Sequence, residues 1–422
     1  MEFARNRQRL CAMLGYCADN SYREPLWDIA QFWKVHPRQS NRTIPKVKGP
    51  TVIPLVWEGC DMIQTNPRGA AVAAVVLVVC GLRSGSVWAA NPAKPSLQVE
   101  KSIPLPHVKG GFDLMAADVA GRRLFVAGQD NNTLEVIDLA AGKSAKSVGG
   151  LHQPKGIVYL PETHKIYVSN KDDGVVHVFD SESFRPIAAI DFKVKANNIR
   201  YDPKAKLIYV GYGDGAIGII NTVDDSRGDD IPLAGFPKQF RLEKRGNRIF
   251  VNVPTPNHIA VIDRKQKKVI ATWPVTEAKS NVPMDLDEEH HRLFIACDPG
   301  KFVVFDTAAV RRFDGTAPPL AVHEAASAAA GKSVASLAIH PEADGIQYDA
   351  KRQRIYVSCG AGVIEVIRQV DPNQYWLIES VATETGAGTS LFVPELDRLY
   401  VAVPQGKGRP AEIKVYRPVD DR

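Results

Sequence analysis

The sequence predicts an all-β fold, a seven-bladed β-propeller of four-stranded antiparallel blades whose last blade is closed by an N-terminal strand. Three observations support this prediction. A short apolar phrase occurs seven times, its copies start at steps of 42, 42, 41, 44, 62 and 44 residues, and the last repeat lacks one strand that an upstream segment can supply. A period in the low forties, built from β-branched and aromatic residues, is typical of propeller blades.

The repeated phrase is apolar at consecutive positions instead of alternating ones. Its copies are Leu124–Ala127, Ile166–Ser169, Ile208–Gly211, Ile249–Asn252, Leu293–Ala296, Ile355–Ser358 and Leu399–Ala402. Consecutive apolar residues are expected where both faces of a strand are covered, as between packed blades. A buried helix is the competing interpretation, but the runs are short, β-branched and flanked by Gly, Asp and Pro, which favours strands.

The second repeat shows how each copy supplies four strands. A first strand over Gly156–Leu160 leads through a polar turn to the phrase at Ile166–Ser169. Gly174 and the neighbouring aspartates favour a hairpin, because a positive φ costs little there. Val175–Phe179 is then expected to be the third strand, and Pro186–Ile190 the outer one.

The seventh repeat supplies three strands, over Leu391–Val393, Leu399–Val403 and Glu412–Tyr416. The extended segment Leu97–Ile103 is unassigned, so we expect it to complete this blade and to protect its exposed edge. The fifth repeat is longer than the others. Aligning its outer strand with that of the second repeat leaves an insertion at about residues 309–331.

The first 90 residues differ in character from the repeats. Residues 69–82 are apolar and uncharged, and small residues precede a cleavage point after Ala89 or Ala90, which predicts a secretory signal peptide over 62–90. Translation is then expected to begin near Met62, with residues 1–61 a non-native or disordered leader. Fourteen apolar residues span only about 21 Å as a helix, so we expect no permanent membrane anchor. The propeller would occupy residues 91–422 of a periplasmic or secreted protein.

The charge of the propeller segment bears on the kind of partner that we expect. The chain has 53 Lys and Arg against 47 Asp and Glu, but residues 91–422 contain only 42 and 41 of these. The propeller is therefore nearly neutral, and nucleic acid is weakly supported as a partner.

Cys297 and Cys359 follow the phrase in neighbouring repeats. Equivalent positions of adjacent blades are about 9 to 10 Å apart, too far for a disulfide, so we expect two buried thiols.

The repeats resemble the secreted seven-bladed propellers of the YVTN-repeat family, including its YncE-like bacterial members. The resemblance covers roughly residues 97–418 and is carried by Tyr167–Asn170 and by Ile259–Asp263, a strand that ends in Ile-Asp. It implies a periplasmic or surface propeller without assigned catalysis, although some relatives are reported to bind DNA and similar propellers occur inside redox enzymes. Arg368 and Arg417 replace the motif's Asp in the last two repeats.

A binding site is expected at the mouth of the central channel, where the loops that lead into the first strands converge. Counting back from the phrase places eight polar residues there: Asp113, Lys155, Asn197, Asn198, Lys238, Gln239, Asp344 and Thr389. This ring predicts a site for a small polar ligand. Asp113, Asn198 and Asp344 could instead hold a divalent cation, since their oxygens are of the kind that calcium takes. A solvated rim without a ligand is the third interpretation.

Catalytic motifs are absent from the sequence: it contains no His-Glu-x-x-His, Gly-x-Ser-x-Gly or Cys-x-x-Cys-His. Gly213–Gly218 spells a dinucleotide fingerprint, but it falls in a strand hairpin and is interpreted as a turn. We therefore expect an exported binding protein without a cofactor, whose partner is a protein, a polymer or a small polar ligand. A metal-assisted, lactonase-like hydrolase and a DNA-binding propeller are the two alternatives.

Overall fold

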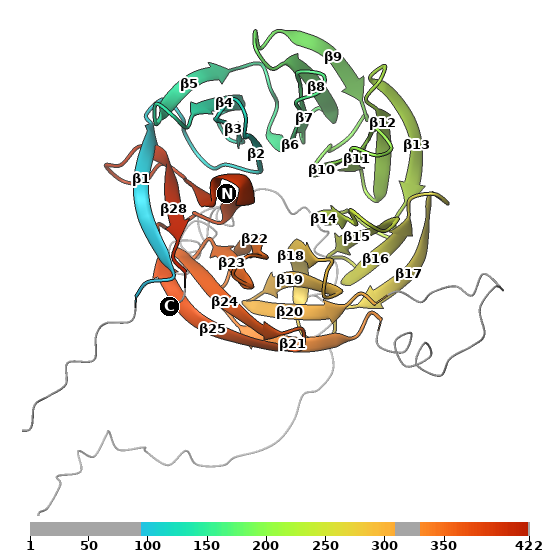
Figure 1. Ribbon diagram of the computed structural model, residues 1–422. Coiled ribbons are helices and arrows are strands. Elements are labelled where there is room, and N and C mark those ends of the chain that lie inside the picture. Colours follow the sequence, from blue (N-terminus) through green and yellow to red (C-terminus); the bar gives the residue numbers. More distant parts are fainter. Residues whose placement is uncertain (1–93, 309–329, 421–422) are drawn as a thin grey trace, which may run out of the picture. The chain divides into compact units, whose positions relative to one another are not determined.

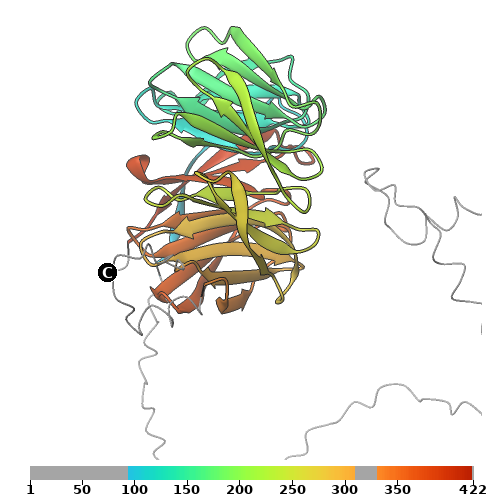
Figure 2. The ribbon, with the colours of Figure 1, turned by 90° about the vertical axis from the view of Figure 1, so that its right-hand side faces the viewer.

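The computed structural model describes residues 94–308 and 330–420, which form a ring of seven four-stranded antiparallel sheets (Figure 1). Each sheet is one blade, with its first strand nearest the channel and its fourth strand at the rim. Figure 2 shows the ring from the side. The predicted leader and signal peptide, residues 1–90, lie outside the described residues, as does most of the predicted insertion.

Blades 1 to 3 each consist of four consecutive strands. They are β2 (Met115–Asp118), β3 (Arg123–Gly128), β4 (Thr133–Asp138) and β5 (Lys143–Val148); β6 (Pro154–Leu160), β7 (Lys165–Asn170), β8 (Val175–Asp180) and β9 (Pro186–Asp191); and β10 (Ile199–Asp202), β11 (Leu207–Tyr212), β12 (Ala216–Asn221) and β13 (Ser226–Pro232). The turn at Gly213 joins β11 to β12, with a φ of 63°, so the dinucleotide-like motif is a hairpin.

Blades 4 to 6 repeat the same order. They are β14 (Phe240–Leu242), β15 (Arg248–Val253), β16 (His258–Asp263) and β17 (Lys268–Pro274); β18 (Lys279–Asp287), β19 (Arg292–Asp298), β20 (Lys301–Asp306) and β21 (Ser333–Ala338); and β22 (Ala343–Asp349), β23 (Arg354–Cys359), β24 (Val363–Asp371) and β25 (Gln374–Ala382). The long repeat places its extra residues between β20 and β21, the third and fourth strands of blade 5.

Blade 7 joins the two ends of the described chain. It consists of β26 (Thr389–Val393), β27 (Arg398–Val403), β28 (Ala411–Pro418) and β1 (Leu97–Leu105), with the short 3₁₀ helix η1 (Pro394–Leu396) between β26 and β27. β1 pairs antiparallel with β28 from Leu97 opposite Pro418 to Leu105 opposite Ala411. The predicted closure by an N-terminal strand is therefore confirmed, and Figure 1 shows the two strands side by side.

The core lies between the blades. The seven copies of the apolar phrase occupy the second strands β3, β7, β11, β15, β19, β23 and β27, and their residues are buried. The described residues form seven apolar clusters, each shared by two adjacent blades. Both faces of every second strand are thus covered, which is why the phrase is apolar at consecutive positions.

The outer strand of each blade carries an irregularity in its pairing with the neighbouring strand. A register shift interrupts the pairing of the third and fourth strands at corresponding places in blades 1 to 6, and that of β28 with β1 in blade 7. An extra residue of this kind increases the local twist of a strand. It lets the rim strands curve around the ring while the inner strands stay close to the axis.

The two cysteines of the described residues are buried and unpaired, as expected: Cys297 ends the apolar run of β19, and Cys359 ends β23. Within residues 94–308 and 330–420, none of the helical structure is long and apolar enough to cross a bilayer.

Candidate functional site

Polar residues gather where the first strands begin, at one end of the channel. They line a cavity of about 170 Å³, here called the mouth cavity, to which blades 1 to 6 all contribute. Seven of the eight residues predicted from the sequence line it, namely Asp113, Lys155, Asn197, Asn198, Lys238, Gln239 and Asp344. Each lies within two residues of the start of a first strand, so the repeat spacing brings them to the same level of the ring.

Thr389 is not among these residues. It begins β26 and lines a second cavity of about 220 Å³, here called the deep cavity, whose walls come from later positions of the same first strands. Gln239 and Asp344 line both cavities. Thr389 is buried, with 6% of its surface exposed, so the counting rule places it at the mouth although its side chain lies within the blade.

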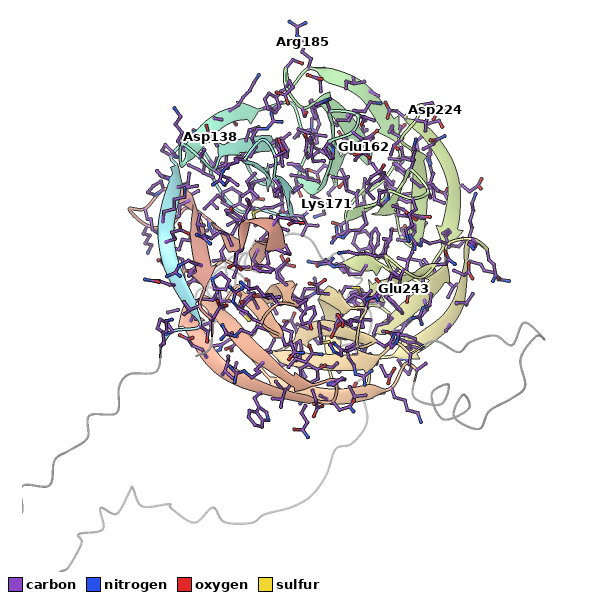
Figure 3. All side chains as sticks on the ribbon, in the orientation of Figure 1. Asp138, Glu162, Lys171, Arg185, Asp224 and Glu243 are labelled. Carbon is purple, nitrogen blue, oxygen red and sulfur yellow. The ribbon has the colours of Figure 1, made fainter. Side chains whose placement is uncertain are left out.

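Sequence reasoning missed three residues of the mouth cavity, Gln129, Lys171 and Phe236. Gln129 and Lys171 each follow a copy of the apolar phrase, where the second strand ends. Because the second strand runs antiparallel to the first, its end returns to the level of the mouth. The residue five places after the start of each phrase is therefore the signal that could have found them. Figure 3 shows Lys171 toward the centre of the ring.

One side of the mouth is internally neutralised. Lys155 Nζ lies 3.0 Å from Asp113 Oδ2 and also donates to Gln129 Oε1. The other carboxylate oxygen of Asp113 accepts a hydrogen bond of 2.9 Å from the backbone N–H of Leu114. Both charged side chains are mostly buried, so this pair is held in place by its surroundings.

The other side carries charges without such partners. In the part of the chain that the structure describes, neither the Lys171 nor the Lys238 ammonium contacts a carboxylate. Lys238 Nζ lies 5.8 Å from the centre of the Phe236 ring, an arrangement that is attractive for a cation but does not neutralise it. These two lysines present positive charge to the cavity.

Asp344 supplies the opposite charge. Asp344 is exposed to the channel and lines the cavity. Partial desolvation among the surrounding blades, and then the negative charge of Asp113, raise its pKa to about 6, while Lys238 and Lys155 act in the other direction. Its backbone carbonyl accepts a hydrogen bond of 2.7 Å from Gln239 Nε2. Beside the Asp113–Lys155 pair, the mouth therefore holds two lysines without an ion-pair partner among the described residues and one carboxylate, Asp344, that is mainly ionised at pH 7.

The three candidate cation ligands do not form a ready metal site. Asp113 is engaged by Lys155, and Asn198 Oδ1 accepts a hydrogen bond of 3.5 Å from Arg200. No group of three His, Cys, Asp or Glu side chains placed to hold a metal ion occurs among residues 94–308 and 330–420. A divalent cation would have to displace the ammonium of Lys155, so the donor set fits an organic ligand better.

Comparison with known proteins gives the fold alone. No family model matches the sequence, so membership of the YVTN-repeat family stays a resemblance. Among solved structures, hydrazine synthase from Kuenenia stuttgartiensis is similar, with a TM-score of 0.61 and 17% sequence identity, over 75% of this chain and 98% of that one. The chain is a seven-bladed β-propeller, a fold consistent with an interaction scaffold.

Proposed function

We propose that the protein is an exported, non-catalytic binding protein whose mouth cavity takes a small zwitterion such as a free amino acid. The observation that carries this proposal is that charged side chains of both signs line the mouth cavity, some of them without an ion-pair partner. Lys171 and Lys238 lack a carboxylate partner among the described residues, while Asp344 faces the same cavity. A ligand with one carboxylate and one ammonium complements both signs.

The size of the mouth cavity agrees with such a ligand. A volume of about 170 Å³ is below that of pockets for drug-sized molecules, which run from about 300 to 1,000 Å³. The side-chain amides of Asn197, Asn198 and Gln239 add hydrogen-bonding groups around the charges. A few well-placed polar groups of this kind fix the orientation of a small ligand.

The test is a thermal-shift and calorimetric titration of the full-length chain with single amino acids. A ligand present at 100 times its dissociation constant should add about 2.7 kcal/mol to the free energy of unfolding. Lys238→Ala and Asp344→Asn should each weaken binding at least about tenfold, a loss of about 1.4 kcal/mol. Lys143→Ala, on the exposed outer strand β5, is the matched control.

Three results would overturn this proposal. The first is the absence of any bound amino acid, and the second is binding that both mouth variants leave unchanged. The third is turnover of a lactone or ester after loading with calcium or zinc, which would favour the hydrolase alternative. The DNA-binding alternative calls for several aromatic side chains in a basic groove. Of the residues that line the mouth cavity, Phe236 is the one aromatic.

Export is part of the same proposal, and it rests on the apolar segment at 69–82 and the small residues at 89–90. The mature protein should begin at or next to Asn91. Mass spectrometry of the N-terminal peptide from the periplasm or medium tests this. A mature chain that begins upstream of residue 62 would contradict it.

A further inference from the structure

The deep cavity differs in character from the mouth. It lies farther along the first strands and has a volume of about 220 Å³. Aliphatic residues form much of its wall: Leu114, Met115, Ile157, Val158, Ile199 and Leu391. Two arginines, Arg200 from β10 and Arg241 from the strand β14 of the next blade, line the same cavity. About half of the wall is thus apolar, and the polar half contains two guanidinium groups and the Asp344 carboxylate.

Arg241 is neutralised by its surroundings. Its Nε lies 2.9 Å from Asp285 Oδ1, and the other oxygen of that carboxylate accepts a hydrogen bond of 2.7 Å from the backbone N–H of Tyr348. Both oxygens of Asp285 thus accept hydrogen bonds from groups of the protein. Within residues 94–308 and 330–420, Arg241 is the guanidinium that forms an ion pair with it.

Arg200 has no such counter-charge among the described residues. Its Nη1 donates to the backbone carbonyl of Ile199 at 2.7 Å, and its Nη2 donates weakly to Asn198 Oδ1 at 3.5 Å. The guanidinium carbon lies 5.6 Å from the centre of the Phe240 ring. These partners hold the side chain in position, but all of them are uncharged.

A partly buried cation without an ion-pair partner is costly. Desolvation, followed by the neighbouring Arg241 guanidinium, lowers the pKa of Arg200 well below its ordinary value, whereas Asp285 and Asp113 act in the other direction. A guanidinium stays protonated in proteins, so the charge itself remains. An anion that enters the cavity would relieve this cost and form charge-assisted hydrogen bonds with the unused N–H groups.

We propose that the deep cavity is a second binding site, for a short aliphatic carboxylate whose carboxylate group pairs with Arg200 and whose hydrocarbon chain lies against the aliphatic wall. Two observations favour this class over an inorganic oxyanion. One part of the wall is apolar, and the nearby amide donors are already used: Gln239 Nε2 donates to the Asp344 carbonyl and Gln347 Nε2 donates to the Ser390 carbonyl at 2.9 Å. Apart from the arginines, a tetrahedral oxyanion would find only the hydroxyls of Thr389 and Ser390 as side-chain donors in the lining.

The test uses the full-length chain and calorimetric titration with sodium butyrate. Butyramide is the matched neutral probe, and sodium sulfate is the inorganic one. Butyrate should bind, butyramide should bind at least about tenfold more weakly, and sulfate should not compete. Equal affinity for butyrate and butyramide would overturn the role of the charge, and sulfate binding without butyrate binding would overturn the ligand class.

Two variants separate a binding role of Arg200 from a structural one. Arg200→Met keeps the volume but removes the charge, so butyrate binding should be lost while the melting temperature of the free protein rises or stays the same. Arg185→Ala, an exposed arginine at the rim in Figure 3, is the control and should bind butyrate as the unchanged protein does. A lower melting temperature of Arg200→Met would show that the guanidinium is structural and would overturn the proposal. Amino acids and butyrate are titrated separately, so the mouth and deep sites can fail independently.

Discussion

The side chain of Gln239 donates a hydrogen bond of 2.7 Å to the backbone carbonyl of Asp344, which links blade 4 to blade 6 past blade 5. Both residues line the mouth cavity and the deep cavity. The contact therefore lies where the two cavities meet. On one side of it lies the mouth cavity with its lysines, and on the other the deep cavity, which contains Arg200 and a cluster of apolar side chains.

Gln239→Ala should join the two cavities. The free energy of unfolding should fall by only about 0.5–1.5 kcal/mol, the ordinary net value of one hydrogen bond, since solvent in the enlarged cavity can hydrate the freed carbonyl. Butyrate should associate faster in stopped-flow measurements. Gln266→Ala, an exposed glutamine whose amide contacts Asp263, is the control. An unchanged association rate would show that the contact does not limit passage.

The strand that closes the ring should be essential to stability. Ile103 in β1 is fully buried, pairs with Ile413 of β28 and belongs to the apolar cluster between blades 7 and 1. Ile103→Ala should lower the free energy of unfolding by about 2–5 kcal/mol, because it leaves a cavity in that cluster. Val99 lies in the same strand but is 53% exposed, so Val99→Ala should change stability by less than about 0.5 kcal/mol. Urea unfolding of both variants measures this, and equal effects would contradict the closing role.

The fold was predictable because the same strand pattern occurs seven times in the sequence. Seven copies of one phrase define the second strands, and the strand missing from the last repeat points to Leu97–Ile103. The structure extends that strand to Leu105 and adds a register shift between Val99 and Lys101. Such a shift depends on the curvature of the rim, which no local sequence pattern encodes.

The site was predictable in outline because antiparallel strands of similar length start at similar levels. The count from the phrase finds Asp113 and Asp344, but it misses Gln129 and Lys171, which come from the opposite end of the neighbouring strand. It also misses Arg200 as a residue of the channel. Nothing near Arg200 in the sequence indicates that its guanidinium lacks a counter-charge, because the relevant carboxylate, Asp285, is supplied by another blade and is used by Arg241.

Two buried glutamates at matching positions should stabilise blades 1 and 6. Glu365 in β24 accepts a hydrogen bond of 2.5 Å from Ser380 and lies 2.5 Å from His340 Nδ1, while Glu135 in β4 contacts Ser147 and His107 in the same way. Glu365→Gln should lower the free energy of unfolding by about 1–3 kcal/mol, because a buried acceptor is replaced in part by a donor.

Guanidinium unfolding measures this effect, with the exposed Glu289→Gln as the matched control. An effect of the same size in both variants would show that the buried contacts contribute nothing specific.

The two thiols of the described residues should be unreactive in the native state. Burial raises the pKa of Cys297 and of Cys359 to about 12, and the thiolate is the reactive form. Native protein treated with iodoacetamide at pH 8 should show neither peptide alkylated, and unfolding in guanidinium should expose both. Peptide mass spectrometry separates them from the four cysteines of residues 1–90. Rapid native alkylation of either thiol would contradict the burial.

Asp344 should give the protein a distinctive dependence of stability on pH. Its pKa is raised to about 6 by partial desolvation at the channel mouth and by Asp113, whereas an aspartate in the unfolded chain titrates near 4. Between about pH 4 and pH 6 the folded protein therefore binds more protons at this residue than the unfolded chain does. The contribution of Asp344 to stability consequently falls as the pH rises through this window and stays unfavourable above it.

Asp344→Asn should be more stable than the unchanged protein at pH 7 and no more stable at pH 4, as measured by denaturant unfolding across this range. Asp214→Asn, whose side chain is 98% exposed, is the control and should track the unchanged protein. A stability difference for Asp344→Asn that does not vary between pH 4 and pH 7 would show that the surroundings at the channel mouth do not disfavour the ionised carboxylate.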